Sequence, residues 1–168
     1  MDLSEKDDRD RLYDHHKHNL IYIGDYIKFA DTKAGVGLGA ALVMLGFFGN
    51  EAKNIKFSSL SFWDYSLLVG LSPLIVTCYF FIWKVLWPRY TTDITLYMSW
   101  GGIGSFPNTQ AYVSHIEQVE DAELIHAMGN QNYSLAQVCI KKYQNLKYGF
   151  ISLTIGAVIE TVSWFFSK

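Results

Sequence analysis

The stretch that decides the fold is ADTKAGVGLGAALVMLGFFG, residues Ala30–Gly49. Its charged start, Ala30–Lys33, runs straight into a Gly/Ala-rich apolar segment with no turn signal between them. This pattern is typical of one helix that leaves water and enters a bilayer. The apolar part is slightly shorter than the ~20 residues that a span needs, but tilt, local thinning or snorkelling by Lys33 would close the gap. We therefore predict a transmembrane helix over 34–49.

Two further stretches have the composition of membrane spans. The segment 65–87, YSLLVGLSPLIVTCYFFIWKVLW, carries no charge before Lys84 and has tryptophans near its ends, as interfacial aromatics do. Pro73 lies inside it, and membrane helices tolerate proline with a kink. We predict the third span over 148–166 and an extracytoplasmic loop over 50–64.

The remaining segments read as polar helices. Over 1–33, residues at three-to-four spacing form one stripe and its neighbouring row: Leu12, His16 or Asn19, Ile23, Tyr26 and Ala30, then Leu20, Ile27 and Ala34. Within 88–147 we expect a helix break at the glycines, a turn at Pro107–Asn108, a short helix over 109–119, and a longer helix from Asp121. The last helix enters the third span without a turn. The expected fold is an all-α membrane protein with about three transmembrane helices and a helical cytoplasmic domain formed by 1–33 and 88–147.

Charge sets the expected topology. Basic residues flank the entry of span one, the exit of span two and the entry of span three, and all can share one side: Lys28, Lys33, Lys84, Arg89, Lys141, Lys142 and Lys147. The positive-inside rule makes that side cytoplasmic, although Lys53 and Lys56 argue mildly the other way. We expect a multi-pass membrane protein with a cytoplasmic N-terminus and an extracytoplasmic C-terminus. The net charge of −2 gives no reason to expect a nucleic acid polymer as a partner.

Two interpretations remain open for the polar and small residues where the first predicted span begins. Asp31 and Lys33 either pair locally and snorkel, or form a polar cluster that binds a ligand or holds two helices in register. Gly35 and Gly39 form a Gly-x-x-x-Gly face for helix packing, either within the chain or between copies of it.

A single carboxylate, Glu160, lies inside the third predicted span. A charge in mid-bilayer costs about 2.5–3.5 kcal/mol on insertion scales, so such a group usually faces protein or water. It either reaches the far headgroups, which we expect, or lines a pore or an inter-subunit contact.

The sequence shows no pattern typical of a catalytic or metal-binding site. The cluster His15, His16 and His18 lacks the i, i+4 spacing of helical metal sites, so we expect a solvated helix face and no metal. No Ser-His-Asp set, Cys-His pair or paired carboxylates stand out, and we do not expect an enzyme. Two roles are open for the basic and aromatic residues near the membrane, which are Arg89, Tyr90, Lys141, Lys142 and Tyr143. They either set the topology next to anionic lipid, or provide a cation for the phosphate and a ring for the base of a nucleotide.

Three motifs carry a resemblance to a known family. ADTKAGVGLGAAL at 30–42, LYMSWGGIGS at 96–105 and QNYSLAQVCIKKYQNLKYG at 131–149 together resemble the Pycsar effector transmembrane family. Members are bacterial anti-phage effectors that act beside a pyrimidine cyclase, respond to cyclic UMP or cyclic CMP, and then damage the inner membrane. This chain has Tyr97-Met98 where family members tend to have Tyr-Phe.

The resemblance implies a cyclic pyrimidine nucleotide as the activating ligand, with no further cofactor. It also implies a protein of the bacterial inner membrane that forms a homo-oligomer or rearranges, which leads to abortive infection. Ligand contacts would come from Lys33, Arg89, Asn132, Lys142 and Tyr143. A constitutive channel subunit and a membrane scaffold remain alternative functions.

Overall fold

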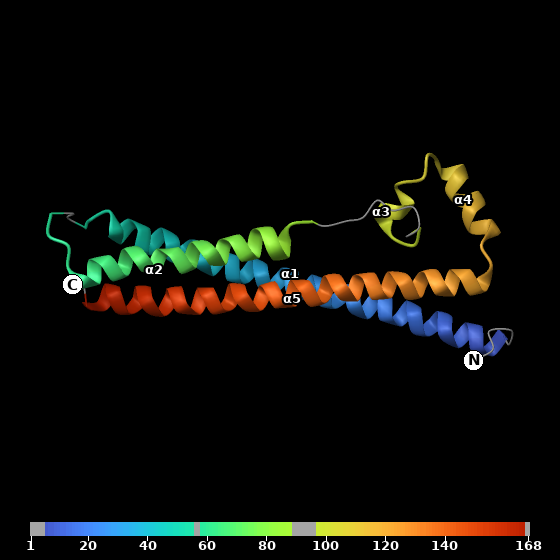
Figure 1. Cartoon of the computed structure of the whole chain (residues 1–168), viewed down its shortest axis with the longest axis horizontal. Helices are drawn as coiled ribbons and strands as arrows, with labels where there is room; N and C mark the ends of the chain where they lie inside the picture. The colour runs from blue at the N-terminus through green and yellow to red at the C-terminus, as the bar shows by residue number, and fades with distance from the viewer. Residues whose placement is uncertain (1–5, 56–57, 89–96, 167–168) are drawn as a thin grey trace. The chain divides into compact units, whose positions relative to one another are not determined.

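The computed structural model describes residues 6–55, 58–88 and 97–166. Helices make up most of this described part and no strand occurs in it, so the all-α prediction is confirmed (Figure 1). In chain order the elements are α1 (Lys6–Ala52), α2 (Phe62–Tyr79), its π-helical continuation η1 (Phe80–Leu86), α3 (Trp100–Ile103), α4 (Thr109–Gln118) and α5 (Asp121–Phe166).

The two longest helices, α1 and α5, each join a polar segment to an apolar one without interruption. They contain 47 and 46 residues, which at a rise of ~1.5 Å per residue is about 70 Å each. Neither contains a proline, since the three prolines of the chain lie at 73, 88 and 107. The continuity that we predicted from the missing turn signals is therefore present in both helices.

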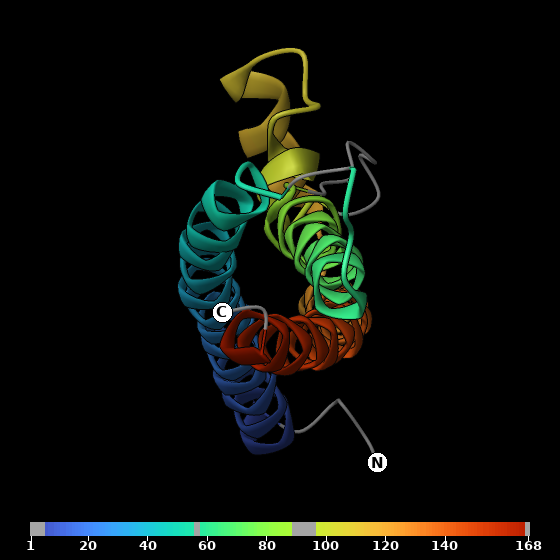
Figure 2. The ribbon, with the colours of Figure 1, turned by 90° about the vertical axis from the view of Figure 1, so that its left-hand side faces the viewer.

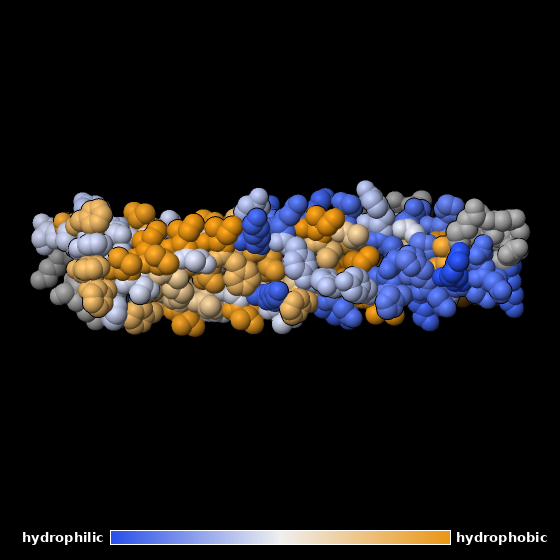
Figure 3. Space-filling view, turned by 90° about the horizontal axis from the view of Figure 1, so that it is seen from below, coloured by the Kyte–Doolittle hydropathy of each residue, from blue (hydrophilic) through white to orange (hydrophobic). Residues whose placement is uncertain are grey.

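Three helices are long and apolar enough to cross a membrane: α1, α2 together with η1, and α5. In their most apolar windows only 22%, 28% and 22% of the residues, respectively, are buried. The apolar side chains of these windows therefore mostly face outward. Figure 3 shows apolar side chains covering a broad patch of the face that it draws. Such a surface fits lipid, while the exact ends of the spans remain as predicted from the sequence.

Helix α2 begins earlier than expected, at Phe62, because Ser61 and Asp64 form a capping box. Ser61 Oγ accepts a hydrogen bond from Asp64 N (3.2 Å), and Asp64 Oδ2 accepts one from Ser61 N (2.8 Å). Further along, Pro73 has no N–H to offer the carbonyl of Val69, and the Ser72 hydroxyl donates to that carbonyl instead (2.8 Å). The helix then widens into η1, where Trp87 N donates to Ile82 O (2.8 Å).

The chain divides into two compact units. The apolar unit consists of the described residues of Lys28–Trp87 and Lys141–Lys168. Its core cluster is Ala30, Ala34, Phe81, Val85 and Leu146, contributed by α1, η1 and α5. The end-on view in Figure 2 shows these helices surrounding one centre.

The polar unit consists of the described residues of Met1–Ile27 and Pro88–Ile140. Here the first half of α1 packs on the first half of α5, whose Ile125 and Met128 are buried. The predicted stripe of α1 faces inward, except that Tyr26 is 44% exposed.

The short helices of the polar unit start at capping side chains. Asn108 Oδ1 accepts from Ala111 N (2.8 Å) and begins α4, which ends one residue before the predicted Val119. Ser99 Oγ caps the one-turn helix α3, at the place where we expected only a helix break.

Candidate functional site

Lys142, one of the predicted ligand contacts, forms an ion pair with Asp31. The pair joins α5 to α1 within the apolar unit, and its side chains are 16% and 37% exposed. Partial burial strengthens a charge-assisted contact of this kind. The geometry is that of a polar contact holding two helices in register, and a phosphate at Lys142 would compete with the Asp31 carboxylate.

Of the other predicted ligand residues, the structure describes Lys33, Tyr143 and Asn132. Lys33 is exposed, and its Nζ lies 4.2 Å from the ring centre of Phe29. Tyr143 packs against the core cluster of the apolar unit. Asn132 belongs to the polar unit, and Arg89 lies outside the described residues.

The close helix contacts of the apolar unit use glycines other than Gly35 and Gly39. Gly35 and Gly39 are exposed, and a Cβ at either would have no close neighbour within 4 Å, so they make no close helix contact in the part of the chain that the structure describes. Instead, the ring of Phe81 lies against Gly37 of α1 and Gly149 of α5. The contact of Gly35 and Gly39 between copies of the chain stays a prediction.

A buried polar contact in the polar unit links Asn132 of α5 to His16 of α1. The Asn132 side-chain nitrogen donates to the His16 carbonyl oxygen (3.1 Å) and lies 3.1 Å from Nδ1 of the same ring. An amide nitrogen can only donate, so Nδ1 accepts and the ring proton sits on Nε2. Burial, with the nearby His15 and His126, lowers the pKa of His16, which favours the neutral ring. The expected solvated face is therefore wrong for His16.

Two amide oxygens at or next to this contact are enclosed without a hydrogen-bond partner among the described residues. Asn132 Oδ1 and Gln131 Oε1 are buried and have no hydrogen bond within the described part of the chain, and both side chains are 8% exposed. Buried acceptors without partners are rare in folded proteins and call for an explanation. Sequence reasoning selected Asn132 but missed Gln131 beside it.

His115 of the polar unit contacts the rings of Tyr97 and Phe106. The Tyr97 ring is 5% exposed and meets the His115 ring edge to face, with centres 4.8 Å apart. Burial, together with Glu123, raises the pKa of Tyr97. Neither Tyr97 Oη nor His115 Nε2 has a hydrogen-bond partner among the described residues. Tyr97 therefore serves as an interior ring and not as an exposed stacking platform.

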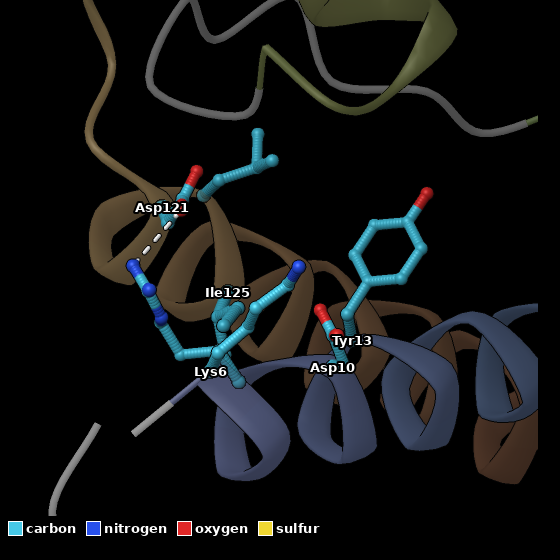
Figure 4. Close-up of a pocket in the computed structure, with 7 residues that line it drawn as sticks. Lys6, Asp10, Tyr13, Asp121 and Ile125 are labelled. Atoms are coloured by element: carbon cyan, nitrogen blue, oxygen red, sulfur yellow. Dashed lines mark hydrogen bonds and ion pairs between the residues drawn. The ribbon is translucent and has the colours of Figure 1, made fainter. Parts of the chain in front are cut away.

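A cavity of about 290 Å³ opens between the start of α1 and the start of α5 (Figure 4). Arg9 Nη1 and Asp121 Oδ2 pair across it at 3.0 Å. The remaining lining residues are Lys6, Asp10, Tyr13, Leu124 and Ile125. The size lies at the lower end of the ~300–1,000 Å³ of small-molecule sites. No part of this cavity was predicted, and its only trace in the sequence is the alternation of charge in the first turns of α1.

Glu160 lies in the apolar unit, where its side chain is fully buried against Gly70 of α2. It faces protein, while its depth relative to the far headgroups stays a prediction. A Cβ at Gly70 would stand 3.1 Å from Glu160 Cδ. Both carboxyl oxygens lack a hydrogen-bond partner within the described residues.

These features define an all-helical membrane protein whose polar unit encloses unpaired acceptors. The chain belongs to the Pycsar effector family, because the Pycsar effector protein domain matches residues 15–167. The resemblance deduced from the motifs is thereby confirmed.

A similar known protein is the Pycsar effector protein SaPycTM of Staphylococcus aureus, 27% identical over 139 residues. The aligned part covers 80% of this chain and 83% of that protein. No solved structure matches the chain. Family membership places the chain among anti-phage defence effectors, which are not known enzymes, and among membrane proteins. Much of the cavity lining, from Lys6 to Tyr13, precedes the matched region.

Proposed function

We propose that this chain binds cyclic UMP or cyclic CMP through its cytoplasmic helices and then oligomerises or rearranges to impair the inner membrane. The infected cell would stop growing before the phage is released. The observation that carries this proposal is the family match over 15–167. The three membrane-capable helices and the polar unit supply parts that such an effector needs.

The polar unit offers acceptors for a pyrimidine base. Cytosine presents an amino donor and uracil a ring N–H, and an amide oxygen can accept from either. Asn132 Oδ1 and Gln131 Oε1 are unpaired, while the Asn132 nitrogen is already used by His16. Because both oxygens are enclosed, the base would have to part α1 from α5 locally before it could bind.

The phosphate of the ligand needs a cation. Of the proposed contacts, Lys33 is exposed, whereas Lys142 would exchange the Asp31 carboxylate for the phosphate. Such an exchange would release a contact between α1 and α5. Arg89 and Tyr143 remain proposed contacts from the family resemblance.

Activation requires a ligand that prefers one state. Shifting a population from mostly inactive to mostly active takes about 5.5 kcal/mol of differential binding. Charge-assisted hydrogen bonds of ~1.5–3 kcal/mol each, with base stacking of ~1–3 kcal/mol, can supply that amount. The unbroken α1 and α5 are suited to carry a shift at the polar residues into the predicted spans.

We place the N-terminus in the cytoplasm and the C-terminus outside, with spans over 34–49, 65–87 and 148–166, from the positions of the basic residues. A reporter that is active only outside the cytoplasm, fused to the C-terminus, should be active. The same reporter inserted within 88–147 should be inactive.

The decisive experiment is thermal unfolding of the full chain, purified in detergent, with cyclic UMP, CMP, AMP and GMP. A ligand at ~100 times its dissociation constant adds about 2.7 kcal/mol to the free energy of unfolding. We expect this with a pyrimidine nucleotide only, and we expect Asn132→Ala to reduce it. The matched control is Asn130→Ala, two residues earlier on α5 and exposed.

Growth of bacteria that produce the chain separates the alternatives. An effector of this type arrests growth only when the cyclic pyrimidine nucleotide is present. A constitutive channel subunit would arrest growth or leak ions without it, and a scaffold would do neither. No thermal shift with any of the four nucleotides would refute the ligand proposal.

A further inference from the structure

The seam between α2 and α5 contains polar groups at several levels, although it lies inside the apolar unit and also packs Leu74 against Gly156. Residues of α2 and α5 approach each other at four levels along this seam. On α2 these residues stand at positions 66, 70, 73 and 77. The spacing of four, three and four keeps them on one helix face, and they extend over roughly 16 Å. A seam of this kind inside predicted spans is unusual, because polar groups at membrane depth usually line a functional path.

Each level is defined by a contact or a close approach. Ser66 and Ser163 meet through their hydroxyl oxygens at 2.7 Å, and Gly70 lies against Glu160. The Pro73 carbonyl accepts from the Ser152 hydroxyl at 2.7 Å. The Thr77 hydroxyl lies 3.4 Å from the Gly149 carbonyl oxygen. We name these four levels the polar seam.

Glu160 differs from the other members because it has no partner. Ser163 bonds to Ser66 and to the Ile159 carbonyl oxygen, whereas both Glu160 oxygens are buried without a hydrogen bond among the described residues. An enclosed carboxyl group without a donor or cation is poorly placed for a purely structural role. It would gain water and a counter-ion as soon as α2 and α5 separate.

Gly70 is what closes the seam over Glu160. A Cβ there would stand 2.8 Å from Ile159 Cγ2 and 3.1 Å from Glu160 Cδ, so only glycine permits this approach. A small displacement of α2 would therefore uncover the carboxyl group.

We infer that the polar seam is the closed form of a path for monovalent cations, with the Glu160 carboxylate as the group that attracts them when the seam opens. The inference rests on the proposed function in so far as the nucleotide opens the seam. In the open state the hydroxyl and carbonyl oxygens would line the path, and a carboxylate favours cations over anions, as in other cation-selective pores. Membrane damage would then be a selective leak of potassium.

The test uses the full chain in vesicles of phosphatidylethanolamine and phosphatidylglycerol loaded with potassium chloride. Leaks of potassium and chloride are recorded with cyclic UMP, with cyclic CMP and without nucleotide. We expect Gly70→Ala to leak potassium without nucleotide, whereas Gly46→Ala, whose new Cβ meets nothing within 4 Å, does not. Adding Glu160→Gln to Gly70→Ala should keep the leak but abolish its preference for potassium over chloride. Adding Glu51→Gln, a change of the half-buried acid near the end of α1, should leave that preference intact.

A cross-link tests the opening independently of Gly70. The Ser66 and Ser163 oxygens are close enough for a disulfide between cysteines at these positions. We would introduce Ser66→Cys and Ser163→Cys into a chain in which Cys78 and Cys139 are serine. Oxidation should abolish the leak, whether caused by a nucleotide or by Gly70→Ala, and reduction should restore it.

The outcomes separate the two proposals. If the wild type responds to neither nucleotide while Gly70→Ala leaks potassium, the seam stands and nucleotide gating fails. If a nucleotide causes an unselective leak that Glu160→Gln and the cross-link leave unchanged, the seam is refuted and the effector function stands. A well-folded Gly70→Ala chain that does not leak also refutes the inference.

Discussion

Replacing Gly37 by alanine should strain the centre of the apolar unit. The new Cβ would stand 2.6 Å from Phe81 Cε2, 2.8 Å from its Cζ and 3.3 Å from Phe150 Cε1. Carbon atoms prefer ~3.5–4.0 Å, so the Phe81 ring would have to move by about 1 Å. It is fully buried and also lies against Gly149, which leaves it little room. Overpacking of this kind costs about 1–3 kcal/mol.

The matched control for this change is Gly46→Ala on the same helix, where nothing lies within 4 Å. Alanine is a better helix former than glycine by about 1 kcal/mol, but this gain applies to both variants and cancels in their difference. Thermal unfolding in one detergent should therefore place Gly37→Ala about 1–3 kcal/mol below Gly46→Ala. Equal stability of the two variants would show that Phe81 is not held between these helices, and would refute the packing of the apolar unit.

Three further predictions rest on single contacts and are measured by thermal unfolding. Ser61→Ala removes the capping box of α2 and should cost about 1 kcal/mol. Asp31→Ala leaves the mostly buried Lys142 amine without its partner and should cost about 1–2 kcal/mol, with no comparable loss if Lys142→Ala is already present. The pKa of His16 is lower in the folded chain than in the unfolded chain, so the unfolded chain binds a proton first as the pH falls. The contribution of His16 to the free energy of unfolding is therefore fully present above the ordinary pKa of histidine, and it is lost as the pH falls through the pKa of the folded chain. His16→Asn should remove part of this acid sensitivity, whereas the same change at the exposed His18 should not.

Much of the helical framework could be predicted because its signals are local. The lack of a turn between charged and apolar residues predicted the unbroken α1 and α5, and Pro107-Asn108 predicted the start of α4. The capping box at Ser61 also lay in the sequence, as Ser followed by Asp three residues later, but we assigned that stretch to a loop. The widening of the helix into η1 has no local signal that we recognise.

The candidate site was harder to predict because its contacts join distant positions. Asp31 and Lys142 are 111 residues apart, and His16 and Asn132 are 116 apart. Periodicity shows that a glycine lies on a helix but not which face of that helix a neighbour covers. It therefore could not distinguish Gly37, which makes the contact, from Gly35 and Gly39. A buried Glu160 cannot be told from a snorkelling one until the opposing Gly70 is known.

The absence of any linker within α1 and α5 has a consequence for building chimaeras of this family. In a flexible junction the number of residues matters little, but in a continuous helix each added residue turns all following side chains by ~100° about the axis. An exchange of segments near Ile27 and Ile140 must therefore conserve the residue count on both helices. Insertions of seven residues would nearly restore the phase, with a drift of ~20°, whereas insertions of one or two would point the wrong faces inward. Length variation among relatives should accordingly occur in the segments between the long helices or at the chain ends.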